Sequence, residues 1–269
     1  MKIKKYKDKY GPAIRRWAPL LMEEYDRHGD VMKETACVAC HFGQVTGFGF
    51  LMQGNDRVNV EFAGKSGKHE VEASCLILQQ LARKGVRVWC RRGNDLYYHF
   101  LEVLGFREDR AMNTMELSLQ EADFAPGDFD GDYVLETPHF DEAGMHAYAE
   151  ATGLAFGTPD SEKEMWYRLK YTDAVIYTVS HRERIAAALT VYPLEDGTVA
   201  TENIFTVPEY RRRGIMTCLM KTVLMKLKDE GFQKARLTVL ADNEAAIALY
   251  ERLGYNYKYC SLEMVFSGE

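Results

Sequence analysis

The sequence predicts an α/β (α+β) fold of two related domains, each with a mixed central β-sheet flanked by helices. The second half of the chain repeats a pattern found in the first half, and strand-like runs alternate with helix-like runs within each half. An acidic stretch without periodicity, residues 121–131, separates the halves. The 269 residues are enough for two domains of ordinary size.

The repeat is clearest where a strand, a helix and a glycine follow one another. Residues 91–106 match residues 240–255 without a gap, at an offset of 149 (243 − 94) that pairs Asn94 with Asn243. Upstream, each copy has a helix that ends in a glycine, which is the usual residue after a helix C-terminus. Two strands joined by a turn precede that helix in each half: 44–51 and 57–62 in the first, 184–190 and 198–206 in the second.

Each half is therefore expected to contain N-terminal helices, a three-stranded meander, a helix, a strand, a helix and a final strand. Residues 115–119 are expected to close the first sheet, and residues 261–266 the second. The predicted domains are residues 1–120 and 132–269, with the acidic stretch 121–131 as the linker.

The composition restricts the class of protein. Hydrophobic residues make up 46% of the chain and charged residues 28%, as in soluble globular proteins. With a net charge of −6, the chain has no overall positive field that would attract nucleic acid or an anionic membrane surface. No run of 18 apolar residues suggests a membrane span. The default expectation is a cytoplasmic protein that acts on neither nucleic acid nor membrane.

One cysteine pattern suggests a cofactor. Cys37-Val-Ala-Cys40-His41 has the spacing of a c-type haem attachment site, but it lies in a strand-like run. Because strand side chains alternate between faces, Cys37 and Cys40 are expected on opposite sides of the sheet. No second cysteine pair completes a zinc site. The sequence therefore predicts buried cysteines and no metal.

The most informative segment joins a strand to a helix in the second half. A strand-like run ends in Pro208, the turn Arg211-Arg212-Arg213 ends at Gly214, and an amphipathic helix follows. Backbone N–H groups and the positive end of a helix dipole then converge on one point, which suits a phosphate. Charge alone would favour a solvated, exposed arginine turn. The proline, glycine and helix favour phosphate binding.

The order of elements, this turn and the segment Asn-Glu-Ala-Ala-Ile-Ala-Leu-Tyr-Glu-Arg-Leu-Gly-Tyr resemble the GNAT superfamily of acetyl-CoA-dependent N-acetyltransferases. In that family the turn reads Arg or Gln, two residues, Gly, one residue, then Gly or Ala. Arg211, Gly214 and Met216 stand at these positions, and Met216 departs from the pattern. A methionine amide can still bind phosphate if its side chain points away. The resemblance covers the second half well and the first half weakly, so the chain resembles two tandem GNAT domains.

The resemblance implies that acetyl-CoA is the cosubstrate and that an amine-bearing molecule is the acceptor, with a homodimer as one assembly compatible with it. The strand before the turn would pair with the pantetheine arm. The expected acetyl-CoA contacts are Ile204, Phe205, Thr206, Arg211, Arg212, Arg213, Gly214, Ile215, Met216, Thr217 and Asn243.

Two catalytic residues are expected. The resemblance makes Tyr250 the acid that protonates the departing thiolate, although a core tyrosine is the structural alternative. An amine of pKa about 10.4 is only about 10⁻³ neutral at pH 7, so a base is expected. Glu202, four residues before Thr206, is either this base or a solvent-facing carboxylate. His139 and His146 are weaker candidates. Asn243 could cap the helix, contact CoA, or do both.

The first half lacks this constellation. Leu101 stands where Tyr250 would be, and the loop 63–69 has no Arg-x-x-Gly pattern. We therefore expect a degenerate first domain and a catalytic second one. Two alternatives stay open: a protein that binds acyl-CoA without catalysis, and a transferase that uses another acyl-CoA.

Overall fold

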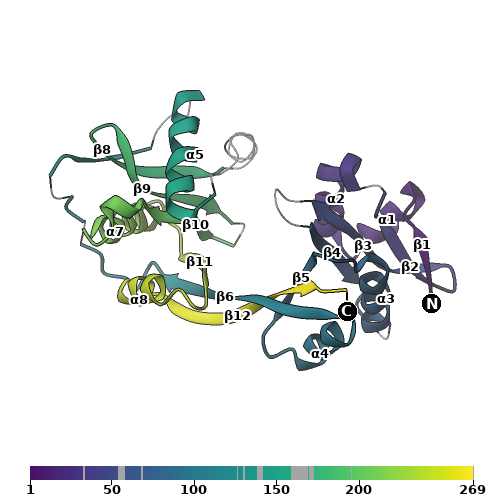
Figure 1. Ribbon diagram of the computed structural model, residues 1–269. Helices are drawn as coiled ribbons and strands as arrows, with labels where there is room; N and C mark the ends of the chain where they lie inside the picture. Colours follow the sequence, from purple (N-terminus) through teal and green to yellow (C-terminus); the bar gives the residue numbers. More distant parts are fainter. Residues whose placement is uncertain are drawn as a thin grey trace. The chain divides into compact units, whose positions relative to one another are not determined.

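The structure is a computed structural model that describes all residues except 33, 54–57, 68, 126, 130, 138–141, 159–168, 170–172, 195 and 269. It divides the chain into two compact units (Figure 1). The first unit comprises Met1–Ala111 together with Cys260–Glu269, and the second comprises Met112–Tyr259. The C-terminal residues therefore belong to the same unit as the N-terminus.

The first unit has a mixed sheet with helices on both faces. Its strand order is β1-β2-β3-β4-β5-β12, and only β4 and β5 are parallel. The strands are β1 (Lys2–Lys5), β2 (Cys37–His41), β3 (Gln44–Gln53), β4 (Val58–Gly64), β5 (Val86–Arg91) and β12 (Asn256–Phe266). The helices are α1 (Gly11–Ile14), α2 (Pro19–Met32), α3 (Glu70–Leu81) and α4 (Asp95–Val103), with a 3₁₀ turn at Asp8–Tyr10.

Two apolar clusters cover the two faces of this sheet. Side chains of α1 and α2, such as Ile14 and Met22, pack with Val38 and Phe48 on one face. Side chains of α3 and α4 pack with alternate strand residues on the other face. Cys37 belongs to the α3 and α4 cluster, whereas Cys40 belongs to the α1 and α2 cluster.

The placement of the two cysteines confirms the expectation from strand alternation. Both are buried, at 4% and 5% exposure, and they lie on opposite faces of β2, so they cannot jointly hold a haem. Among the described residues, no group of three or more histidine, cysteine, aspartate or glutamate side chains is arranged to hold a metal ion.

The second unit has a mixed sheet around one apolar core. Its strand order is β6-β11-β10-β9-β8-β7, and only β10 and β11 are parallel. The strands are β6 (Phe106–Ser118), β7 (Tyr133–Glu136), β8 (Val175–His181), β9 (Arg184–Pro193), β10 (Thr198–Thr206) and β11 (Lys234–Leu240). The helices are α5 (Glu142–Phe156), α7 (Ile215–Asp229) and α8 (Glu244–Arg252), with a 3₁₀ turn at Pro208–Tyr210.

The closing strands are exchanged relative to the sequence-based expectation, which is wrong on this point. Residues 112–118 of β6 pair with β11 of the second unit, and residues 261–265 of β12 pair with β5 of the first unit. The alternation of apolar residues determines which face of a strand is buried. It does not determine which of two similar sheets the strand joins.

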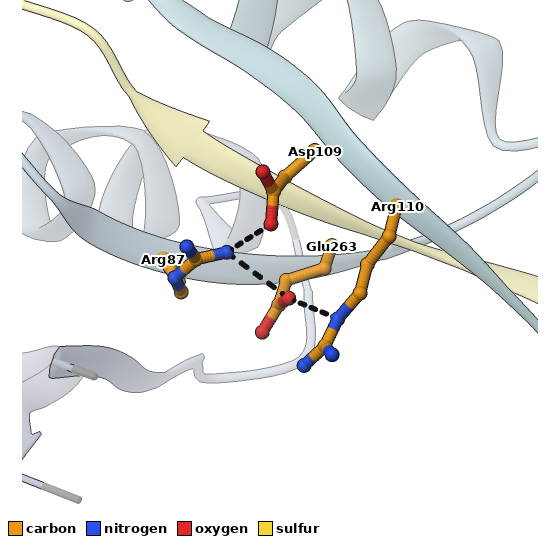
Figure 2. Close-up of polar contacts among 4 residues, drawn as sticks. All are labelled: Arg87, Asp109, Arg110 and Glu263. Carbon is orange, nitrogen blue, oxygen red and sulfur yellow. Dashed lines mark hydrogen bonds and ion pairs between the residues drawn. The ribbon is translucent and has the colours of Figure 1, made fainter. Parts of the chain in front are cut away.

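A carboxylate on the exchanged C-terminal strand helps to hold it in the first unit (Figure 2). Glu263 is only 1% exposed and accepts hydrogen bonds from Arg87 of β5 at 3.1 Å and from Arg110 of β6 at 2.6 Å. Arg87 also pairs with Asp109. Charged partners from two neighbouring strands therefore compensate a buried charge on β12.

The segment expected to be a linker is packed within the second unit. The Lys228 ammonium of α7 donates to the Ala122 carbonyl at 2.7 Å, and the Cys218 thiol donates to the Asp128 carbonyl at 3.3 Å. A Cβ at Gly127 would lie 2.5 Å from the Cys218 Cα, so only glycine fits against the helix there. The described part of residues 121–131 thus runs along α7.

The internal repeat reproduces local geometry as well as sequence. Asn94 and Asn243 each cap a helix, because their side-chain oxygens accept from the amides of Tyr97 at 3.4 Å and Ala246 at 3.2 Å. Within the described part of the chain, no helix is long and apolar enough to cross a membrane.

Candidate active site

The parallel strands of the second unit are paired for only part of their length. Thr198–Thr201 pairs with Lys234–Leu237, and no pairing with β11 is recorded for the rest of β10 among the described residues. On its other side, β10 remains paired with β9 up to Thr206. A bulge lies between Glu202 and Phe205. One backbone edge of the last part of β10 is therefore left without a strand partner.

The bulge is a feature that sequence reasoning missed. Asn203 adopts a φ of 47°, in the left-handed region that asparagine tolerates better than most residues. Such a bulge re-aims the strand and interrupts its pairing. The asparagine inside a strand-like run was the signal that could have revealed it.

A tight turn joins β10 to α7. Gly214 is the N-cap of α7 with a φ of 76°, and Arg212 has a φ of 63°. The first amides of a helix have no intrahelical acceptor, so those of Ile215, Met216 and Thr217 are available at this end. The first turn of α7 contains no acidic residue. These features make the helix start a favourable place for an anion.

The departure of Met216 from the family pattern is accommodated. Its side chain is partly buried and packs against the core of the second unit.

The three arginines of the turn differ in their contacts. Arg211 donates to the carbonyl of Thr206 at 3.1 Å and to that of Ala155 at 3.2 Å. Arg213 donates to the Glu209 carbonyl at 2.9 Å and lies over the Tyr210 ring. Arg212 is exposed, and no contact of its side chain is recorded within the described chain. Two arginines thus brace the turn, while Arg212 is free to meet a ligand.

Tyr250 lies on α8 and is buried, with 5% of its surface exposed. Burial raises the pKa of its hydroxyl to about 12. Its ring centroid is 5.9 Å from that of Tyr255, so it also takes part in the core. Both the structural and the catalytic interpretations of this tyrosine fit such a position. No hydrogen-bond partner of its hydroxyl is recorded among the described residues.

The other candidates occupy different environments. Glu202 is exposed on β10, opposite Thr190 of β9 and just beyond the part of β10 that pairs with β11. Asn243 is the N-cap of α8, which uses its side-chain oxygen and leaves its amide group for other contacts. His146 is exposed on α5, and His139 lies outside the described residues. Phe205 is buried, whereas Ile204 and Thr206 are partly exposed.

The first unit has a different constellation at the equivalent positions. Leu101 is completely buried in its core. The first turn of α3, the helix equivalent to α7, contains Glu70 and Glu72. Glu61 and Glu202 occupy equivalent positions in their sheets. Val58 pairs with Val86 in the first unit as Val199 pairs with Ala235 in the second, and each glutamate lies three residues further along its strand (61 − 58 and 202 − 199). The carboxylate is therefore present in both units, whereas the tyrosine and the acid-free helix start are present only in the second.

Comparisons with known proteins agree with this geometry. The sequence profile of the acetyltransferase (GNAT) family matches residues 145–255. The [ribosomal protein bS18]-alanine N-acetyltransferase of Salmonella typhimurium is 34% identical over 116 residues, which cover 43% of this chain and 70% of that protein.

Solved structures share the fold of both units. A GCN5-related N-acetyltransferase from Sphaerobacter thermophilus superposes with a TM-score of 0.74 at 15% identity, covering 98% of this chain and 94% of that chain. A tandem GNAT protein from the clavulanic acid biosynthesis pathway superposes with a TM-score of 0.67 at 14% identity, covering 85% and 81%. On the combined evidence of profile, relative and fold, this chain belongs to the GNAT acetyltransferase family and is an N-acetyltransferase.

Proposed function

We propose that the second unit transfers the acetyl group of acetyl-CoA to an amine of an acceptor molecule. One observation carries the proposal: the part of β10 beyond its described pairing with β11 leads directly to the acid-free N-terminus of α7. An extended chain that ends in a pyrophosphate matches that arrangement, because it can pair as a strand and place its phosphates on the helix amides.

The phosphates would be bound mainly by the backbone. The amides of Ile215, Met216 and Thr217 donate to them, and the positive φ of Gly214 presents these amides together. Arg212 supplies an exposed positive charge, whereas Arg211 and Arg213 keep the turn in shape through their carbonyl contacts.

The thioester carbonyl needs a donor in the transition state. The Val207 amide is already used, since it donates to the Ala186 carbonyl at 2.9 Å. In an antiparallel pair, successive residues point their amides to opposite sides, so the Thr206 amide faces away from β9. We assign this amide the role of stabilising the developing oxyanion.

The acceptor amine must lose a proton before or during attack. Glu202 lies just beyond the paired part of β10 and is exposed to water, so it can accept this proton through a water molecule. Attack of the neutral amine then forms a C–N bond, and collapse of the tetrahedral intermediate breaks the C–S bond.

Tyr250 would act on the departing sulfur. With a pKa of about 12, its hydroxyl is neutral at physiological pH and can donate a hydrogen bond. Complete proton transfer to a thiolate of pKa about 8.5 would be uphill by roughly 5 kcal/mol. Tyr250 is therefore proposed to stabilise the thiolate by hydrogen bonding as it forms, while the net proton comes from the amine.

Release of free thiol from acetyl-CoA tests the proposal against a panel of acceptors. The panel contains small amines, aminoglycoside antibiotics and peptides with a free amino-terminal alanine, the last because of the Salmonella typhimurium relative. We expect amine-dependent release with at least one acceptor, and an acetylated product by mass spectrometry. Tight binding of acetyl-CoA without turnover would instead support a non-catalytic binding protein.

Longer acyl-CoA molecules form the second arm of the same assay. We expect a higher rate with acetyl-CoA, because the proposed site is that of an acetyltransferase. A higher rate with a longer acyl group would favour the alternative acyltransferase.

A further inference from the structure

A cleft of the first unit lies between its splayed parallel strands. It has a volume of about 540 Å³ and is lined by β4, β5, α3 and α4. Recorded pairing between β4 and β5 covers only Val58 with Val86 and Asn59 with Arg87. A cleft of this size suits a small organic molecule. Its position in the first unit is equivalent to that of the proposed acetyl-CoA site in the second unit.

The charged residues that line this cleft are acidic. Glu61 of β4 and Glu70 at the start of α3 both line it, and no described lysine or arginine does. Glu72 adds a further carboxylate in the first turn of α3. Acidic residues in the first turn interact favourably with the positive end of the helix dipole and repel a phosphate, so they disfavour phosphate binding there. This cleft is therefore poorly suited to coenzyme A.

No lysine or arginine among the described residues forms an ion pair with Glu61. Burial raises its pKa, and the negative charge of Glu24 raises it further. Neither influence favours the ionised carboxylate. A cation bound beside Glu61 would supply the compensation that the protein does not.

The remaining walls of the cleft are mostly apolar and aromatic. Phe62, Tyr97 and Phe100 contribute rings, and the centroids of Phe62 and Tyr97 are 6.1 Å apart. Such rings bind apolar bodies and also attract cations through their faces. The buried Tyr97 hydroxyl has no hydrogen-bond partner among the described residues, so it is available to form a hydrogen bond with a bound ligand.

From size, charge and lining together, we propose that the cleft of the first unit binds a small organic cation, an amine carried on an apolar or aromatic body. It is a binding site without transfer chemistry, because Leu101 replaces the tyrosine and Glu70 opposes the phosphates. The proposal does not depend on the reaction proposed for the second unit, and its test involves no turnover.

Trp89 provides a direct probe, since it lines the cleft and is 43% exposed. Its fluorescence is titrated with phenethylamine, with the uncharged 2-phenylethanol and with the anionic 3-phenylpropionate. We expect a saturable change with phenethylamine, at least about tenfold tighter than with the other two, as a paired charge in a partly desolvated site would give. Trp89→Phe should abolish the signal, which assigns it to this cleft.

Paired substitutions identify the groups responsible. In the double variant Glu61→Gln and Glu70→Gln, phenethylamine should bind about tenfold more weakly, while 2-phenylethanol binding is unchanged. Tyr250→Phe, in the other unit, should leave the titration unaltered. Circular dichroism of each variant checks folding, and the three wild-type titrations test the proposal even if the double variant fails to fold.

Several results would overturn the proposal. One is equal or tighter binding of 3-phenylpropionate, and another is a Trp89 response to acetyl-CoA at lower concentrations than to phenethylamine. A folded double variant with unchanged phenethylamine affinity would also do so. Finally, the absence of any saturable change with phenethylamine, agmatine or spermidine up to about 10 mM would show that no useful cation site exists.

Discussion

Tyr250 and Leu101 occupy equivalent positions in the two units, each seven residues after an asparagine that caps its helix (250 − 243 and 101 − 94). Both side chains are buried, so packing alone would accept either residue. Leucine lacks both the aromatic ring and the hydroxyl of tyrosine, and burial raises the pKa of the Tyr250 hydroxyl to about 12. The proposed chemistry of the second unit therefore depends on a group that the fold does not require.

Replacing Tyr250 with phenylalanine tests this role. We expect kcat to fall by about 10- to 100-fold, the usual effect of losing a hydrogen bond to a charged group, while the acetyl-CoA KM and the melting temperature change little. The matched control is Tyr255→Phe, which removes a hydroxyl from the neighbouring ring and should preserve kcat. An unchanged kcat in Tyr250→Phe would remove this residue from the mechanism.

Gly214 tests the phosphate-binding turn. Its φ of 76° means that Gly214→Ala should cost about 1–2 kcal/mol of stability and disturb the start of α7, which raises the KM for acetyl-CoA. Gly231, with a φ of 93°, lies beyond the other end of the same helix. Gly231→Ala should cost similar stability without affecting that KM. Equal KM values in the two variants would contradict the assignment.

Glu61 is expected to make the first unit less stable as the pH rises. Because its folded pKa is raised, the carboxyl is neutral in both states at low pH, and the folded state loses stability as the pH rises through the unfolded and then the folded pKa. Glu61→Gln should therefore melt at a higher temperature than the wild type at pH 7, with the difference closing below about pH 4.

Melting curves from pH 4 to 8 give this comparison. Glu150→Gln, an exposed change on α5, serves as the control and should shift stability by less than about 0.5 kcal/mol at any pH. A melting temperature of Glu61→Gln below the wild-type value at pH 7 would show that Glu61 has a compensating partner after all.

At the scale of elements, the exchanged closing strands are the main departure from expectation. Each strand alternates two buried apolar residues with polar ones (Met115 and Leu117, Leu262 and Met264), so either strand could have completed either sheet. Two ion pairs between residues far apart in the sequence connect the strands that pair in the structure. Glu116 of β6 meets Arg236 of β11 at 2.9 Å, and Glu263 of β12 meets Arg87 of β5.

The environment of Glu116 shows how such contacts act. Burial tends to raise the pKa of this carboxyl, but hydrogen bonds from Arg236 and Lys258 outweigh burial and lower the pKa overall. The ionised carboxylate is therefore favoured in the folded state. This contribution to stability is present above the unfolded pKa and is lost as the pH falls through the folded pKa.

Glu263→Gln tests the contribution of the C-terminal strand. Removing this charge leaves Arg87 and Arg110 without their shared partner, and we expect a loss of about 3 kcal/mol in the free energy of unfolding. Urea denaturation measures this loss. Glu108→Gln, which breaks the exposed pair with Arg92, should cost less than about 1 kcal/mol. Similar losses in both variants would mean that burial of Glu263 is not the cause.

At the scale of the whole molecule, the chain contains two versions of one fold that differ in the acidity of the first turn of the equivalent helix. The turn before α7 has three arginines and the first turn of α7 no acid, whereas the first turn of α3 has Glu70 and Glu72. We therefore expect isothermal titration calorimetry to find one acetyl-CoA per chain.

Two variants make this stoichiometry informative. Arg212→Ala should weaken the single acetyl-CoA site by about tenfold, the value of one charge-assisted contact. Lys65→Ala, in the exposed loop of the first unit, should leave the affinity unchanged. Two acetyl-CoA molecules per chain would contradict the proposed difference between the units.

The sequence by itself determined the local features of this protein. The repeat, the capping asparagines, the glycine turn and the alternation that separates Cys37 from Cys40 all depend on residues close together in the chain, where propensity and periodicity act directly. The family resemblance depends on the same short segments.

The tertiary structure decided what depends on distant partners. It placed the C-terminal strand in the first unit, tied Arg211 to the carbonyls of Thr206 and Ala155, and placed Glu61 in a cleft that no described lysine or arginine lines. Pairing between strands far apart in sequence is selected by the packing and charge of the folded chain, and a periodic pattern read along one strand contains no information about its neighbour.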